Sequence, residues 1–259
     1  MAMPSVPVDL FIQAIDELLK LDYKWIPEVE NASLYIRPFM IATDEYVGIK
    51  ESDHYKFVIF CSPVGNYYSA PVKVYLSEEY IRAFPGGTGM AKCAGNYGAT
   101  LFPLRKIKAL GYDQMLWLDG IERKYIQESG TMNVFFVIGD KLITPNIEEG
   151  TILNGVTRDS IITIIKQKGI DFEERPISID EVFEAQSNGT LKDAFGAGTA
   201  ATIAQIVKIG YRDTYFDLPE IESRTISNMI KETLYGIKRG ELEDTNHWNH
   251  IIPISELVH

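Results

Sequence analysis

A glycine-rich run from Gly86 to Gly98 contains a lysine and a tyrosine, Lys92 and Tyr97. Glycine adopts backbone conformations that other residues avoid and lets another group approach the main chain closely. Apolar side chains beside a lysine remove water from its amine and favour the neutral, nucleophilic form. These neighbours are Met90, Ala91 and Ala94. Such a lysine can form a Schiff base with an aldehyde, whereas the structural alternative is a surface loop with a solvated lysine.

Glu128 stands before a short Ser-Gly-Thr turn and a following apolar strand. A carboxylate at such a place can pair with a pyridinium nitrogen and keep it protonated, so that the ring accepts electrons. Considered by itself, Glu128 is also explained as a solvated acid in a turn.

Two further turns combine glycine with threonine. Residues 155–157 (Gly-Val-Thr) open a helix, and residues 198–200 (Gly-Thr-Ala) form a second turn. Free N–H groups at a helix N-terminus favour a phosphate, and a threonine hydroxyl adds a donor. The structural alternatives are a plain helix start and a plain bend.

These motifs occur in an order that resembles the branched-chain amino acid aminotransferases, a family of fold-type IV pyridoxal-phosphate enzymes. The motifs are residues 33–38 (Ser-Leu-Tyr-Ile-Arg-Pro), 92–98 (Lys-Cys-Ala-Gly-Asn-Tyr-Gly), 128–133 (Glu-Ser-Gly-Thr-Met-Asn), 155–158 (Gly-Val-Thr-Arg) and 198–200 (Gly-Thr-Ala). The resemblance covers essentially the whole chain, and the motifs in order are far more specific than any one of them. It implies an α/β (α+β) fold in which an incomplete small domain precedes a larger mixed-sheet domain that binds the cofactor.

The resemblance implies a role for each cofactor-binding residue. Lys92 would form the Schiff base with pyridoxal 5'-phosphate and then move a proton between the amino acid and the cofactor. Tyr97 would hydrogen-bond the phenolic oxygen of the cofactor, and Glu128 would hold its protonated pyridine nitrogen. The phosphate would be held by the backbone amides of Val156 and Thr157 and by the hydroxyl of Thr199.

The resemblance also places residues around the substrate. Thr131 and Ala200 would lie near the substrate α-carboxylate. The side-chain pocket would be lined by Tyr35, Arg37 and Tyr67, where an arginine and a tyrosine can meet the distal carboxylate of glutamate. An unpaired buried guanidinium is costly, so water or a tyrosine must satisfy it when leucine is bound.

The chain departs from the family pattern at its beginning. The family has a further N-terminal stretch of the small domain, with an arginine that binds the cofactor phosphate, and the resemblance starts after it. We therefore expect an N-terminally truncated form, in which losing one charge-assisted contact costs about 1.5–3 kcal/mol. Ala201 and Ala204 stand where some animal members carry a CxxC redox switch. Ile49 matches a position that reaches the partner's pocket in a homodimer.

The expected activity is transfer of an amino group between leucine, isoleucine or valine and 2-oxoglutarate in a ping-pong mechanism, giving branched 2-oxo acids and glutamate. One alternative is a D-amino acid aminotransferase or an aminodeoxychorismate lyase on the same fold. Tyr35 with Arg37 and the Gly-Thr-Met-Asn run favour the branched-chain enzymes. A second alternative is a folded fragment that binds the cofactor weakly or not at all and turns nothing over.

The composition limits the partners and the compartment. A formal net charge of −11 argues against nucleic acid and anionic membranes, which attract cationic surfaces. No apolar run is long enough to span a membrane. Cys61 and Cys93 form no CxxC, which is typical of a reducing cytoplasm. His247 and His250 have no further ligand at a spacing typical of zinc.

Hydrophobic periodicity predicts a helix over residues 7–21 and then strands over 33–40, 57–62 and 72–76, with a hairpin tip at 43–55. From residue 77 strands and helices alternate. The expected helices are 99–110, 156–168, 179–187 and 221–238, and the expected strands are 114–118, 125–128, 133–138, 141–144, 172–177 and 205–209. We expect a small-domain remnant over residues 1–65, an interdomain loop over 66–76 and a cofactor-binding domain over 77–259.

Overall fold

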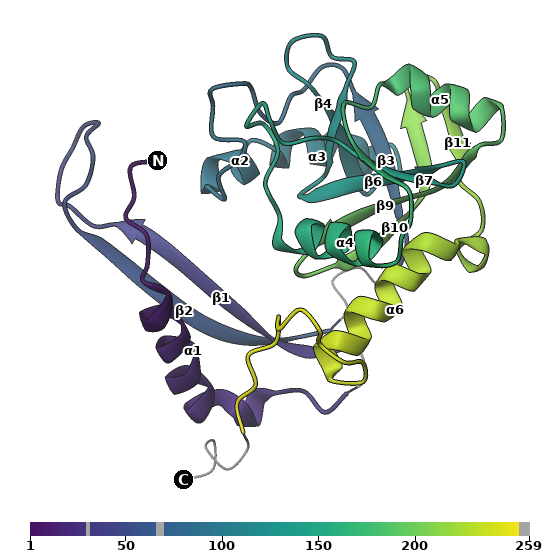
Figure 1. Ribbon diagram of the computed structural model, residues 1–259. Helices are drawn as coiled ribbons and strands as arrows, with labels where there is room; N and C mark the ends of the chain where they lie inside the picture. The colour runs from purple at the N-terminus through teal and green to yellow at the C-terminus, as the bar shows by residue number, and fades with distance from the viewer. Residues whose placement is uncertain (30–31, 66–69, 254–259) are drawn as a thin grey trace. The chain divides into compact units, whose positions relative to one another are not determined.

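The computed structural model describes residues 1–29, 32–65 and 70–253 (Figure 1). The chain divides into two compact units, of which the first comprises Met1–Tyr67 with Asp244–His259 and the second comprises Tyr68–Glu243. Within the described residues, every helix is too short or too polar to cross a membrane.

The first unit consists of a helix packed on a two-stranded antiparallel hairpin. Its elements are α1 (Val8–Asp22), the 3-10 turn η1 (Tyr23–Trp25), β1 (Ser33–Ala42) and β2 (Tyr55–Val64). The helix contacts β2 through its apolar side, where the rings of Phe11 and Phe57 lie 5.8 Å apart between centroids. The tip of the hairpin is held by Asp44, whose carboxylate accepts hydrogen bonds from the backbone N–H groups of Asp53 and His54. The expected helix, strands and hairpin tip are all present.

The second unit is built around strands that close on themselves. The closed set follows the order β3 (Val72–Ser77), β4 (Gln114–Leu118), β5 (Ile126–Ser129), β6 (Met132–Ile138), β9 (Leu191–Gly198) and β10 (Thr202–Tyr211), and β10 pairs again with β3. Three shorter strands extend it: β7 (Lys141–Thr144), β8 (Phe172–Glu174) and β11 (Thr214–Asp217). Parallel and antiparallel pairs both occur, which confirms the predicted mixed sheet.

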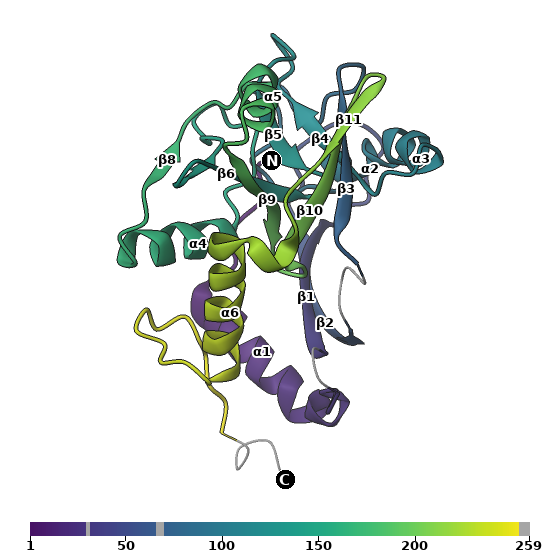
Figure 2. The same cartoon turned by 90° about the vertical axis from the view of Figure 1, so that its right-hand side faces the viewer.

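Helices cover different sides of these strands (Figure 2). They are α2 (Ala94–Gly98), α3 (Leu101–Ala109), α4 (Val156–Gln167), α5 (Ile179–Ser187) and α6 (Thr225–Arg239), with a 3-10 turn η2 (Ile221–Ser223) before α6. Helix α3 contacts β4, whereas α4 and α6 contact each other and β9. Helix α5 begins with a capping interaction in which the Ser178 hydroxyl accepts the N–H of Glu181 at 3.1 Å.

The core of the second unit has two main layers. Strand residues such as Leu116 and Phe136 pack with the apolar side of α5 in one cluster. In the other cluster, apolar residues of α4 and α6 cover Phe135 and Phe195. These two rings face each other across neighbouring strands and stack with centroids 5.1 Å apart. Burial of these side chains fixes the ends of the strands, which carry the polar residues described below.

Three segments differ from the expected elements. Strands β9 and β11 were not predicted, and the glycines of β9 favour a bend when the sequence is considered without its partners. A side chain at position 196 would collide with Met132 of the neighbouring strand β6. Gly196 therefore makes room for Met132 within the sheet and does not form a turn. The short helix α2 lies within the glycine-rich run, where propensity alone disfavours a helix.

The unit boundaries also differ from the expected ones. Residues 72–76, placed in the expected interdomain loop, form most of β3, which pairs with β4 and β10 inside the second unit. The residues from Asp244 onward group with the first unit. One contact that holds them there joins Nε2 of His250 to the Asp16 carboxylate of α1 at 2.8 Å.

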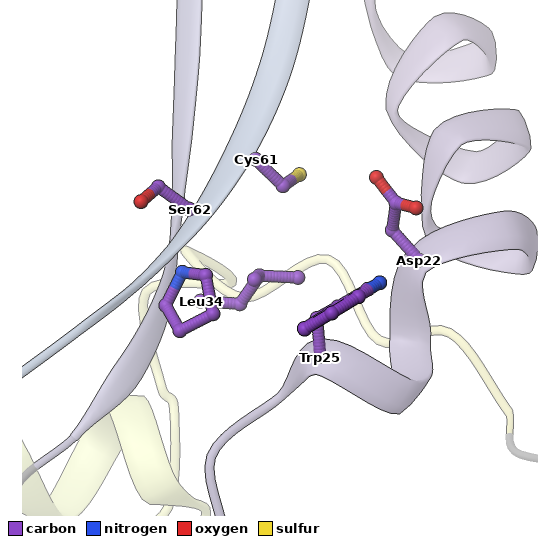
Figure 3. A pocket seen from close by; sticks show the side chains of 6 residues that line it. Asp22, Trp25, Leu34, Cys61 and Ser62 are labelled. Carbon is purple, nitrogen blue, oxygen red and sulfur yellow. The ribbon is translucent and has the colours of Figure 1, made fainter.

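The first unit contains an open pocket between η1 and the base of the hairpin (Figure 3). It is lined by Asp22, Trp25, Leu34, Cys61, Ser62 and Pro63. None of the residues assigned a chemical role by the sequence lines this pocket.

Candidate active site

The turns that carry the sequence motifs meet at one end of the closed sheet. Strands β6 and β9 run antiparallel with Asn133 opposite Ala197, so the start of β6 lies beside the end of β9. The turn before β6 contains Thr131, and the turn after β9 contains Thr199 and Ala200. Both turns therefore project from the same edge, and the three residues are exposed there.

Glu128 is the buried acid of this edge, with only 2% of its surface exposed. Its Oε1 accepts the backbone N–H of Leu153 at 2.8 Å, and its Oε2 lies 2.8 Å from Nε of Arg82. Burial raises the pKa of Glu128 to about 7, while the Arg82 charge, the Leu153 N–H and the Lys92 charge act in the opposite direction. The solvated turn acid that the sequence allowed as an alternative is excluded by this burial.

Lys92 lies close enough to Glu128 for its charge to lower the pKa of the acid. Its Nζ donates to the hydroxyl of Tyr97 at 3.2 Å and lies 5.3 Å from the centre of that ring. The side chain itself is exposed, in contrast to the expected water-free lysine. The physical reason is that the apolar neighbours do not cover it, since Met90 is 63% exposed.

The turn that leads into Lys92 is held by Asn96 on α2. The Asn96 amide donates to the carbonyls of Thr88 and Ala91 at 2.7 and 2.9 Å, and its Oδ1 accepts the Thr88 hydroxyl at 2.8 Å. A side chain at Gly89 would collide with the Thr151 carbonyl, so glycine is required for the close approach of these two segments. The loop is therefore fixed by specific polar contacts although it is rich in glycine.

Asn133 holds the turn that precedes α4. Its amide donates to the carbonyl of Leu153 at 2.8 Å, while Glu128 accepts the N–H of the same residue. Its Oδ1 also lies where a side chain at Gly155 would be, so glycine is required at the N-cap of α4. The cap is Gly155 and not the neighbouring Asn154, although asparagine is a common N-cap residue. The buried acid and the start of α4 are thereby connected through one backbone unit.

The N-terminus of α4 presents backbone N–H groups without intrahelical acceptors. Val156 and Thr157 are its first residues, and they follow the turn that Glu128 and Asn133 hold. Arg158, the next residue, is buried and points its guanidinium to the Pro145 carbonyl and to Glu174 at 3.0 and 2.6 Å. The start of α4 is thus held by the contacts of the turn before it and by those of Arg158. The partial positive charge at the N-terminus of a helix favours binding of an anion.

The remaining sequence-predicted residues belong to the first unit or lie outside the described residues. The guanidinium of Arg37 lies 4.8 Å from the ring centre of Tyr35, two positions along the same strand face. Ile49 is fully exposed in the loop between β1 and β2. Tyr67 lies outside the described residues.

Three contributors to the site were missed by sequence reasoning: Arg82, Asn96 and Asn133. Each is a buried polar residue whose partners are mostly backbone carbonyls of turns. Asn96 and Asn133 lie inside two of the sequence motifs, 92–98 and 128–133. The signal that could have identified them is that each is a polar residue within a motif to which no role had been assigned. Arg82 precedes the glycine run, and its partners become apparent only when the chain is folded.

The donor set can be compared with the shape of a pyridoxal-type ligand. Such a ligand needs an amine for its aldehyde, an acid for its ring nitrogen, and N–H groups for its phosphate. The second unit supplies Lys92, Glu128 and the N-terminus of α4, and Leu153 joins the last two. These residues fit the cofactor that the sequence motifs imply.

Comparison with known proteins supports this assignment. The sequence profile of the family described as amino-transferase class IV matches residues 3–209. The chain is 44% identical to a probable branched-chain-amino-acid aminotransferase of Staphylococcus aureus strain MRSA252, over 97% of this chain and 71% of that protein. It is 43% identical to branched-chain-amino-acid transaminase 1 of Bacillus subtilis strain 168, over 96% of this chain and 70% of that protein. The chain belongs to the class IV aminotransferase family.

Solved structures show the same fold. The branched-chain aminotransferase of Thermoproteus uzoniensis, solved with norvaline, matches with a TM-score of 0.78 and 26% identity over 94% of this chain and 75% of that one. The branched-chain amino acid aminotransferase of Escherichia coli matches with a TM-score of 0.76 and 24% identity, over 95% and 76% of the two chains. The predicted family and the fold-type IV architecture are confirmed.

Proposed function

We propose that the protein is a pyridoxal-phosphate-dependent aminotransferase that moves the amino group between branched-chain L-amino acids and 2-oxoglutarate. The observation that carries the proposal is the buried acid Glu128, which lies near the Lys92 amine and is hydrogen-bonded to the turn before α4. The relatives named as branched-chain aminotransferases supply the substrate class.

The cofactor supplies an aldehyde that captures amines and a ring that takes up an electron pair from the substrate carbon. The chain's own residues bind and orient it. The Glu128 carboxylate would accept a hydrogen bond from the protonated ring nitrogen. The N–H groups of Val156 and Thr157 and the hydroxyl of Thr199 would bind the phosphate. Because burial makes the Glu128 carboxylate a stronger base, it holds a shared proton more tightly than a solvated acid would.

Lys92 would meet the aldehyde of the cofactor, and Tyr97 would meet its phenolic oxygen. The Tyr97 hydroxyl accepts a hydrogen bond from Nζ of Lys92 at 3.2 Å and so orients the amine. When its amine is free, Nζ of Lys92 can take a proton from the α-carbon of the amino acid and later release it, which is the proton transfer that transamination requires. Tyr97 also has a hydroxyl proton to donate to an oxygen on the ring.

A reduction experiment tests this assignment. Borohydride treatment in the presence of pyridoxal 5'-phosphate should leave a covalent adduct that peptide mass mapping places on Lys92. The variant K92A should lose the adduct, whereas K108A, an exposed lysine on α3, should keep it. An adduct absent from the wild type, or present on other lysines only, contradicts the proposal.

A substrate panel tests the specificity. We expect leucine, isoleucine and valine to react with 2-oxoglutarate, and branched 2-oxo acids to be formed. We propose that Thr131 and Ala200 face the substrate α-carboxylate and that Tyr35, Arg37 and Tyr67 line the side-chain pocket. Activity with D-alanine and none with leucine would instead identify a D-amino acid aminotransferase.

We further propose a cytoplasmic homodimer. The fully exposed aliphatic residues Val47 and Ile49 lie close together at the hairpin tip and support contact with a second copy, because neighbouring exposed apolar side chains are typical of protein–protein contact sites. Light scattering after gel filtration measures the mass, and I49D should shift it toward a single chain if this tip is at the interface.

A further inference from the structure

Arg82 connects three segments of the site by hydrogen bonds. Its Nε lies 2.8 Å from Oε2 of Glu128, Nη1 donates to the Thr151 carbonyl at 2.8 Å, and Nη2 donates to the Gly89 carbonyl at 3.1 Å. These partners belong to β5, to the turn before α4 and to the loop before Lys92. One side chain therefore connects Glu128 to the turn before α4 and to the loop that leads into Lys92.

The pair that Arg82 forms with Glu128 is removed from water. The side chains of Arg82 and Glu128 are 4% and 3% exposed. Taking two charges out of water is costly unless each finds good partners, so such a pair is seldom a device for stability alone. A fixed fork of donors lets arginine meet a carboxylate and two carbonyls together, which the point charge of lysine cannot do.

The Glu128 carboxylate retains acceptor capacity beyond its contacts with Leu153 and Arg82. A carboxylate offers about four lone-pair directions. Leu153 N–H occupies one direction on Oε1, and Arg82 occupies one on Oε2. Both oxygens are thereby held in place while each retains a direction for a further donor.

We infer that Arg82 is a positioning residue, which sets the Lys92 loop, the turn before α4 and Glu128 in fixed relation and favours the ionised form of the Glu128 carboxylate. The identity of the donor that Glu128 receives, a protonated ring nitrogen, rests on the proposed function. The contacts that Arg82 makes with Glu128, Thr151 and Gly89 are present in the protein without any ligand.

The inference is tested on the ligand-free protein, labelled with carbon-13 at the glutamate side-chain carboxyl. The resonance of Glu128 is identified as the one missing from E128D, and its chemical shift is followed with pH. In the wild type we expect a midpoint near 7, where burial and the opposing charges place the pKa. In R82Q the midpoint should rise by at least one pH unit, which is tenfold in proton affinity.

The conservative variant separates charge from packing. R82K loses the fork of donors but keeps a cation beside Glu128, and because the charge is what lowers the pKa, its midpoint should stay within about half a unit of the wild type. R224K, a control at a second buried arginine that pairs with Asp193, should leave the Glu128 midpoint unchanged. If R82Q does not fold, the Glu128 midpoint of R82K is the test. A difference of more than about one pH unit between R82K and the wild type overturns the inference.

The outcomes distinguish this inference from the proposed function. An R82Q midpoint equal to that of the wild type overturns the role of Arg82, even where Lys92 still forms its borohydride adduct. Conversely, a wild type without that adduct contradicts the proposed function, while the titration still measures the action of Arg82 on Glu128.

Discussion

Glu128 and Leu153 are joined by a hydrogen bond of 2.8 Å from the backbone N–H of Leu153 to Oε1 of the acid. Leu153 lies just before the N-terminus of α4, so the bond fixes the distance between an acid suited to a ring nitrogen and N–H groups suited to a phosphate. The opposite end of the same backbone unit is held by Asn133. A ligand that spans these groups meets a frame that already exists in the protein, and this lowers the cost of ordering it.

The first prediction concerns E128Q. A neutral amide cannot balance a protonated ring nitrogen, so the ring becomes a poorer acceptor of electrons and the rate of transamination should fall about a hundredfold. Steady-state kinetics with leucine and 2-oxoglutarate measure it. The control is E184Q on the exposed side of α5, which should retain the wild-type rate. An E128Q rate within threefold of the wild type would falsify the role of this acid.

The second prediction is a pH dependence of stability. Because burial raises the pKa of Glu128 from 4.5 to about 7, the folded protein holds a proton that the unfolded chain has released between these pH values. The contribution of Glu128 to stability is therefore present below about pH 4.5 and lost as the pH rises through 7. Its size is on the order of 3 kcal/mol.

Urea unfolding of the ligand-free wild type and of E128Q at pH 5 and pH 8 measures this contribution, because E128Q lacks the titrating group. Between pH 5 and pH 8 the free energy of unfolding of the wild type should decrease relative to that of E128Q. A constant difference, or one that favours the wild type at pH 8, contradicts the raised pKa.

The third prediction concerns N133A. Removing the amide leaves the Leu153 carbonyl without its partner and loosens the turn before α4, at a cost of about 1–2 kcal/mol. The dissociation constant for pyridoxal 5'-phosphate should rise about tenfold, as measured by fluorescence titration. N188A at the exposed end of α5 serves as the control. Equal affinity of N133A and the wild type would show that the turn keeps its shape without this side chain.

The fourth prediction compares the two cysteines within one chain. The Thr88 hydroxyl and nearby backbone N–H groups lower the pKa of Cys93, whereas burial raises the pKa of Cys61. A thiolate-selective reagent at neutral pH should therefore modify Cys93 several-fold faster, as followed by peptide mass mapping. T88V should slow the reaction at Cys93 and T88S should not. Faster modification of Cys61 would contradict this order.

The sequence by itself determined the family and the order of most elements, and it predicts which residues have a direct chemical role. Lys92, Glu128 and the start of α4 could be named because the chemistry demands particular residue types, and local turns of glycine and threonine place them at element ends. Short-range signals such as the capping serine of α5 and the apolar strands of the core carry this information.

Only the tertiary structure decided which residues support that chemistry and in what surroundings. Strand β9 is recognisable as a strand only beside β6 and β10, since its glycines have low strand propensity without those partners. The burial of Glu128, the exposure of Lys92 and the reach of Arg82 to three segments depend on contacts between residues far apart in the chain. Burial and pairing of charges are properties of the folded arrangement, and no local pattern specifies them.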